Sequence, residues 1–78
     1  MSKADEMFEK LGYEKDDNYL AHLDYRKSTI EKVISFRNDN TIGVFNYYDN
    51  FEPITMQELQ AINEKVKELG WNENTRIR

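Results

Sequence analysis

The sequence predicts an α+β fold in which a helix, three strands and a second helix follow one another. Two stretches of apolar residues with helical spacing flank a central region of β-branched and aromatic residues. The chain has 78 residues, so two domains would each approach the roughly 40-residue limit for unaided folding. We therefore expect a single domain over residues 1–71, followed by a polar C-terminal tail at 72–78 that frays.

The first helix is predicted to begin after Ser2 and to end at Gly12. Ser2 is a suitable N-cap, and the acidic Asp5 and Glu6 are favoured in the first turn by the helix dipole. Gly12 ends the helix because glycine adopts the left-handed conformation without a Cβ clash. Helical spacing places four apolar residues on one face: Ala4, Met7, Phe8 and Leu11.

The second helix is predicted to begin at Thr55, just after Pro53, and to end at Gly70. Thr55 and Glu58 have the spacing of a capping box, in which each side chain bonds the backbone N–H of the other residue. We expect the helix to bury an apolar stripe made of Leu59, Ile62, Val66 and Leu69.

Three strands are predicted between the helices, at residues 19–25, 30–37 and 41–48. Asn38-Asp39-Asn40 suits a three-residue hairpin loop with Asn40 in the left-handed conformation. This loop fixes a register that places the larger apolar residues on one face. The expected opposite pairs on that face are Phe36 with Ile42, Ile34 with Val44, Lys32 with Asn46 and Ile30 with Tyr48; on the other face they are Ser35 with Gly43, Val33 with Phe45 and Glu31 with Tyr47.

The first strand is predicted to place Tyr19, Ala21, Leu23 and Tyr25 on the same apolar face. Its register is open, because the turn at residues 26–29 contains no glycine. Glu31 lies opposite Asp24 in one alternative and opposite Arg26 in the other, and the second pair is electrostatically better. We expect both helices to pack on the apolar face of this antiparallel three-stranded meander.

The residues needed for catalysis are scarce. The chain has no cysteine, which excludes disulfides, thiolate nucleophiles and cysteine-based metal sites. The single histidine, His22, has Ser35 as a neighbour but no assigned orienting acid, and His22 and Asp24 fall short of a metal site even with Asp16 and Asp17 nearby. The three glycines are isolated and form no phosphate loop. We expect no enzyme activity, no metal and no cofactor.

Charge and hydropathy limit the kinds of partner and the cellular location that the sequence predicts. The formal net charge is -4, which argues against binding nucleic acid. Four cations nevertheless cluster in sequence and form a weak alternative nucleic-acid site: Arg26, Lys27, Lys32 and Arg37. The element order resembles that of double-stranded RNA-binding domains, but residues 54–59 lack the lysines with which that family grips phosphate. The charged N-terminus and the absence of a long apolar run predict a soluble cytoplasmic protein without a signal peptide or membrane span.

The outer face of the predicted sheet is the candidate functional surface. An apolar patch edged by a histidine is expected there, and such patches are typical of partner-binding surfaces. Its candidate partner-binding residues are Leu20, His22, Val33, Phe45 and Tyr47. We therefore predict a protein–protein interaction, with a structural homodimer that uses the same face as the alternative.

Two segments resemble a family of small proteins encoded by phages and prophages of Firmicutes. They are residues 4–13 and 53–71, which cover both predicted helices and together make up 29 of the 78 residues. The family has no assigned function, so the resemblance implies no activity. It implies a mobile-element origin, an intracellular bacterial setting, and a host or phage protein as the partner.

Overall fold

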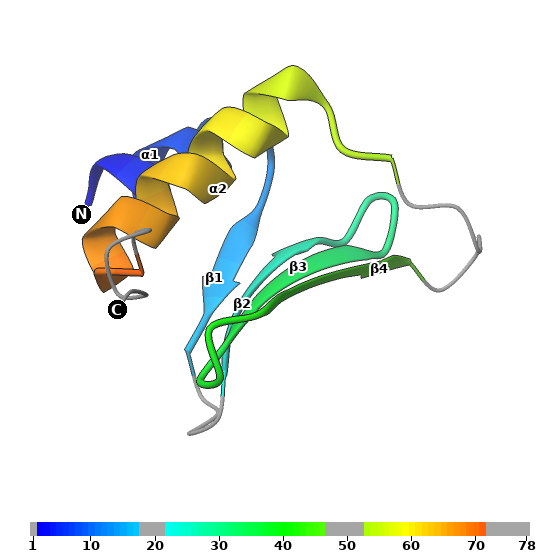
Figure 1. The fold of residues 1–78 in the computed structure, drawn as a ribbon. Helices are drawn as coiled ribbons and strands as arrows, with labels where there is room; N and C mark the ends of the chain where they lie inside the picture. The colour runs from blue at the N-terminus through cyan, green and yellow to red at the C-terminus, as the bar shows by residue number, and fades with distance from the viewer. Residues whose placement is uncertain (1, 18–21, 47–52, 72–78) are drawn as a thin grey trace. The chain divides into compact units, whose positions relative to one another are not determined.

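The computed structural model describes residues 2–17, 22–46 and 53–71, and it confirms the α+β class (Figure 1). Its element order is α1 (Lys3–Lys10), β1 (Glu14–Asp16), β2 (His22–Lys27), β3 (Lys32–Arg37), β4 (Ile42–Asn46) and α2 (Met56–Leu69). The chain forms two compact units: a helical unit of Met1–Leu11 with Ile54–Arg78, and a strand unit of Gly12–Pro53. The single domain over 1–71 and the packing of both helices on one sheet face stay predictions.

The helix ends follow the local signals in the sequence. The Ser2 hydroxyl accepts a hydrogen bond from the Asp5 N–H at 3.0 Å and so caps α1. At α2 the predicted capping box is confirmed: Glu58 N–H donates to the Thr55 hydroxyl at 3.0 Å, and Thr55 N–H donates to the Glu58 carboxylate at 3.1 Å. Gly70 ends α2 with a left-handed φ of 77°.

The buried face of α2 differs from the predicted apolar stripe. Leu59 and Leu69 are exposed, whereas the buried residues of the helix are Glu58, Ala61, Ile62 and Lys65. The reason is that α1 lies beside the Lys65 side of α2 and supplies polar partners there. The correct face therefore could not be found from hydropathy alone.

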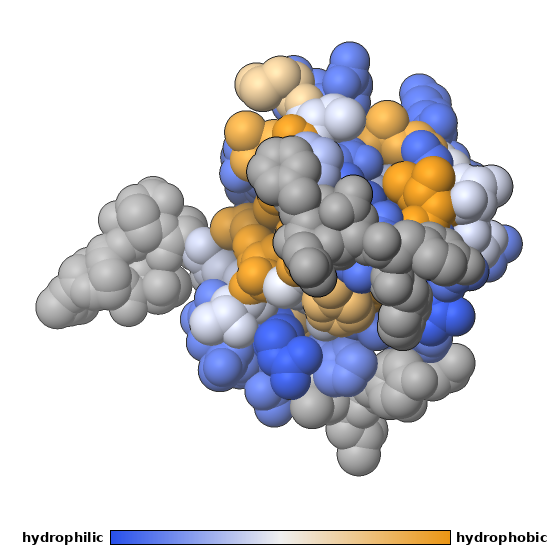
Figure 2. Space-filling model, turned by 90° about the vertical axis from the view of Figure 1, so that its right-hand side faces the viewer, coloured by the Kyte–Doolittle hydropathy of each residue, from blue (hydrophilic) through white to orange (hydrophobic). Residues whose placement is uncertain are grey.

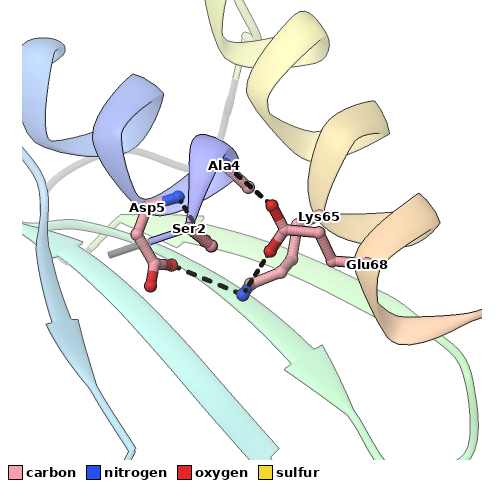
Figure 3. A network of polar contacts seen from close by, with 5 residues as sticks. All are labelled: Ser2, Ala4, Asp5, Lys65 and Glu68. Carbon is pink, nitrogen blue, oxygen red and sulfur yellow. Dashed lines mark hydrogen bonds and ion pairs between the residues drawn. The ribbon is translucent and has the colours of Figure 1, made fainter.

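A charged network joins α1 to α2 (Figure 3). The Lys65 ammonium, on a residue only 6% exposed, lies 3.4 Å from the Asp5 carboxylate and 3.2 Å from the Glu68 carboxylate. The second Glu68 oxygen accepts a hydrogen bond from the Ala4 N–H at 3.0 Å. Glu68 thereby satisfies an N–H in the first turn of α1 that has no partner within its own helix.

This network predicts a stability that falls in acid. Burial raises the pKa of Glu68, but the Ala4 N–H, the Ser2 hydroxyl and Lys65 lower it more, so its pKa lies below the usual 4.5. The folded state binds a proton at Glu68 less readily than the unfolded state. The stabilisation from ionised Glu68 is therefore complete above about pH 4.5 and is lost as the pH falls through the pKa of Glu68 in the folded state. We expect Glu68→Gln to be less stable than wild type at pH 7 and the gap to narrow in acid. Denaturant unfolding of both proteins from pH 7 to 2.5 measures this; a constant gap would contradict it.

The strand unit is an antiparallel sheet in the order β1-β2-β3-β4. The predicted number of three strands is wrong, because β1 forms a fourth. The sequence of β1, Glu14-Lys15-Asp16, has no apolar alternation that would predict a strand. Its place in the sheet comes from backbone pairing with β2, which leaves no hydropathy signal.

The hairpin between β3 and β4 has the predicted register. Phe36 lies opposite Ile42, Ile34 opposite Val44 and Val33 opposite Phe45. Asn40 is left-handed with φ 67°, as the three-residue loop requires. The remaining predicted pairs of this hairpin, with Tyr47 and Tyr48, lie outside the described residues.

Both predicted alternatives for the first strand pairing are wrong. Asp24 lies opposite Ser35, and Arg26 lies opposite Val33. The hairpin loop occupies residues 28–31 and closes with the Glu31 N–H donating to the Ser28 carbonyl, while Glu31 itself adopts φ 54°. Ile30 is therefore an exposed turn residue rather than part of a strand. A four-residue loop that ends in a left-handed non-glycine carries no clear sequence signal.

One face of the sheet holds the apolar residues as predicted. Tyr25, Ile34 and Phe36 are all buried, and the Tyr25 and Phe36 rings meet edge to face with centroids 5.8 Å apart. Leu23 lies on the same face, opposite Phe36. Tyr19 and Ala21, which were assigned to this face, lie outside the described residues.

Candidate interaction surface

The opposite face of the sheet carries the candidate surface, which we name the Phe45 face. The register arranges it in three rows of neighbouring side chains. The first row is Glu14, Arg26, Val33 and Phe45; the second is Asp16, Asp24, Ser35 and Gly43; the third is His22 and Arg37. Charge therefore changes along the first row, from acidic at β1 to arginine at β2 and uncharged at β3 and β4, whereas the second row is acidic at β1 and β2 and uncharged at β3 and β4.

The predicted partner-binding residues differ in how exposed they are on this face. Phe45 is 43% exposed, and His22 is half-buried. Val33 was expected at the surface but is only 2% exposed, since it lies on an inner strand between Arg26 and Phe45. Leu20 and Tyr47 lie outside the described residues. On the side drawn in Figure 2, apolar atoms reach the surface among hydrophilic ones.

His22, Asp24 and Ser35 come together on the Phe45 face. His22 Nδ1 lies 2.8 Å from an Asp24 carboxylate oxygen, and Asp24 lies directly opposite Ser35. An ionised carboxylate only accepts, so in this contact His22 Nδ1 is the donor. The structure thus places Asp24 as an acid beside His22, a contact between residues two apart on one face of β2 that the sequence analysis did not assign.

Ser35 is nevertheless poorly placed as a nucleophile. It is 0% exposed, and its Oγ has no hydrogen-bond partner among the described residues. A nucleophile needs hydrogen-bond contact with its base and access to a substrate. Within residues 2–17, 22–46 and 53–71, no three His, Asp or Glu side chains are grouped so as to hold a metal ion.

The four cations of the alternative nucleic-acid site are divided between the two faces of the sheet. Arg26 and Arg37 are exposed on the Phe45 face. Lys27 and Lys32 lie opposite each other on the other face. There Lys32 is buried and donates to the Pro53 carbonyl at 2.6 Å, and the Lys27 ammonium lies 5.8 Å from the centre of the Tyr13 ring. A phosphate backbone would thus meet two cations rather than four.

The two edges of the sheet differ in chemistry. The edge strand β1 is short and consists of charged residues, which is a common protection against pairing with other chains. The edge strand β4 reads Ile42-Gly43-Val44-Phe45-Asn46 and contains no charge and no proline. The sequence correctly predicted a strand at β4. Its position at the edge of the sheet was not predicted, although its lack of charged residues was visible in the sequence.

These features define, in the described part of the chain, an α+β protein with an exposed aromatic ring on the same sheet face as two exposed arginines and with an uncharged strand at one sheet edge. Comparison with models of protein families, with characterised proteins and with solved structures finds no match for this chain. In the part of the chain that the structure describes, neither helix has the length and hydropathy needed to cross a membrane.

Proposed function

We propose that this protein is a non-enzymatic binding protein that contacts another protein through the Phe45 face. The observation that carries the proposal is Phe45 itself, 43% exposed on the same face as the exposed Arg26 and Arg37. Aromatic residues and arginine are the residue types enriched where binding energy concentrates. A ring of this kind is an anchor for an apolar pocket, and guanidinium groups on the same face favour carboxylates on the partner.

The partner is therefore expected to present an apolar pocket with acidic groups near it. The resemblance of residues 4–13 and 53–71 to small phage and prophage proteins supports a host or phage protein in the bacterial cytoplasm as this partner. The chain then acts as an accessory protein, and its effect on the partner comes from occupying a surface rather than from chemistry.

Replacing the exposed ring tests the proposal. We expect Phe45→Ser to weaken binding of every specific partner at least tenfold, because a hot-spot side chain contributes roughly 2 kcal/mol or more. Ile30→Ser is the matched control, since Ile30 has the same 43% exposure but lies in the β2–β3 turn. The measurement is affinity capture from phage-infected or induced cells with the three proteins, followed by titration of each captured protein. Equal loss in both variants, or retention in both, would refute the proposal.

A homodimer that uses the Phe45 face is the alternative. The exposed ring supports it equally well, because a second copy also offers apolar and acidic groups. Sedimentation across micromolar concentrations separates the two alternatives. A persistent 9.4 kDa species excludes a tight face-to-face dimer and leaves the hetero-partner proposal intact.

A further inference from the structure

The backbone of β4 presents hydrogen-bonding groups to the open edge of the sheet. In the β3–β4 hairpin the Arg37 N–H donates to the Thr41 carbonyl at 2.9 Å, which identifies Thr41 as a residue whose backbone faces β3. Antiparallel strands direct these groups alternately to either side, so Gly43 and Phe45 also face β3. Ile42 and Val44 consequently direct their N–H and C=O groups outward, and among the described segments no strand pairs with that side of β4.

We propose that the β4 edge pairs with β4 of a second copy of this chain, antiparallel and centred on Val44. An open edge accepts an extended strand, because such a strand offers matching donors and acceptors. Pairing β4 with itself opposes no charges, since Ile42–Asn46 is uncharged. Pairing with the other edge would place the charged residues of β1 against this apolar strand. Charge thus favours β4 over β1 as the occupant.

The register follows from the positions of Gly43 and Phe45. With Val44 opposite Val44 of the second copy, all five residues of β4 overlap and Ile42 lies opposite residue 46. Each Phe45 then lies opposite Gly43 of the second copy, in the closer, non-hydrogen-bonded type of pair. Gly43 has no side chain that could clash with the opposite ring, and each Phe45 ring lies over Gly43 of its own strand, with Cε1 3.5 Å from the position of an added Gly43 Cβ. Shifting the two-fold axis by one residue either way loses both this pair and part of the overlap.

The contact is expected to be weak. Five residues span about 17 Å of strand, and such a contact is smaller than the roughly 1,200–2,000 Å² of a stable complex. The dimer should therefore form in the upper micromolar range and dissociate on dilution. Its hydrogen bonds come from the backbone edge of β4 and do not require the proposed partner, although Phe45 borders both contacts.

Val44→Pro tests the edge directly. Proline removes the outward Val44 N–H and leaves the β3–β4 ladder intact, because the Val44 N–H does not face β3. We expect wild type and Val44→Ala to self-associate in sedimentation velocity from about 10 μM to 1 mM, and Val44→Pro to do so at least tenfold more weakly. The Ile42 and Val44 amides of wild type should become protected from hydrogen exchange as concentration rises. A wild type that stays monomeric to about 1 mM, or a proline variant that dimerises equally, overturns the proposal.

Charged substitutions at Val44 test the register, and circular dichroism first checks that each variant folds, because Val44 is half-buried opposite Ile34. Val44→Lys and Val44→Glu should each be monomeric, since like charges would meet at the two-fold axis, and their mixture should recover dimerisation. A mixture that stays monomeric, while wild type dimerises, contradicts a register centred on Val44. Binding of a Phe45-dependent partner by Val44→Pro shows that partner binding does not require β4 pairing, so failure of one proposal is distinguishable from failure of the other.

Discussion

Lys65→Ala is expected to destabilise the protein by about 1–3 kcal/mol, because Lys65 is buried but the Asp5 and Glu68 carboxylates are partly exposed. The substitution leaves the Asp5 and Glu68 carboxylates facing each other across α1 and α2 without the ammonium that lies between them. Breaking a buried pair by removing one member costs more than the pair contributes, because an uncompensated charge stays behind. A chain of 78 residues has a total stability of about 4–12 kcal/mol, so this one change removes a substantial part of it.

The control is Lys67→Ala in the same turn of α2. Lys67 is exposed, and removing an exposed lysine changes stability by about 0.5 kcal/mol or less. Denaturant unfolding followed by circular dichroism compares the two variants with wild type. Equal midpoints for Lys65→Ala and Lys67→Ala would mean that the network between the helices contributes nothing.

The sequence predicted those parts of the fold that depend on short-range signals. Ser2, Thr55 and Gly70 set helix ends through contacts a few residues away, and Asn40 sets the β3–β4 register within its own turn. β1 and the β2–β3 register were missed for the opposite reason. Their pairing depends on backbone geometry and on a left-handed Glu31, neither of which alters the hydropathy pattern.

The candidate surface was predictable to a similar extent. Strand alternation placed Phe45 and Val33 on the same face, and the structure confirms that they are neighbours. Alternation gives the side of the sheet but not the burial, so the 2% exposure of Val33 could not be foreseen. Asp24 contacts His22 within β2, but only the correct β2–β3 register shows that Ser35 lies opposite Asp24.

Two phenylalanines on adjacent strands offer the second large effect. Phe36→Ala is expected to cost about 3–5 kcal/mol, because Phe36 is 2% exposed and its ring meets the buried Tyr25. Phe45→Ala, the same chemical change at a 43% exposed site, is expected to cost about 1 kcal/mol or less. Urea unfolding of both variants measures the difference.

Comparing the stabilities of Phe36→Ala and Phe45→Ala bears directly on function, because it distinguishes a ring that stabilises the fold from a ring that is available for binding. If Phe45→Ala leaves stability nearly unchanged while Phe45→Ser abolishes a contact, folding does not explain an exposed aromatic on the same face as Arg26 and Arg37. If instead Phe45→Ala costs as much as Phe36→Ala, then Phe45 belongs to the core and the proposed binding face loses its anchor. The stability of one variant thus decides whether the search for a partner should begin at β4.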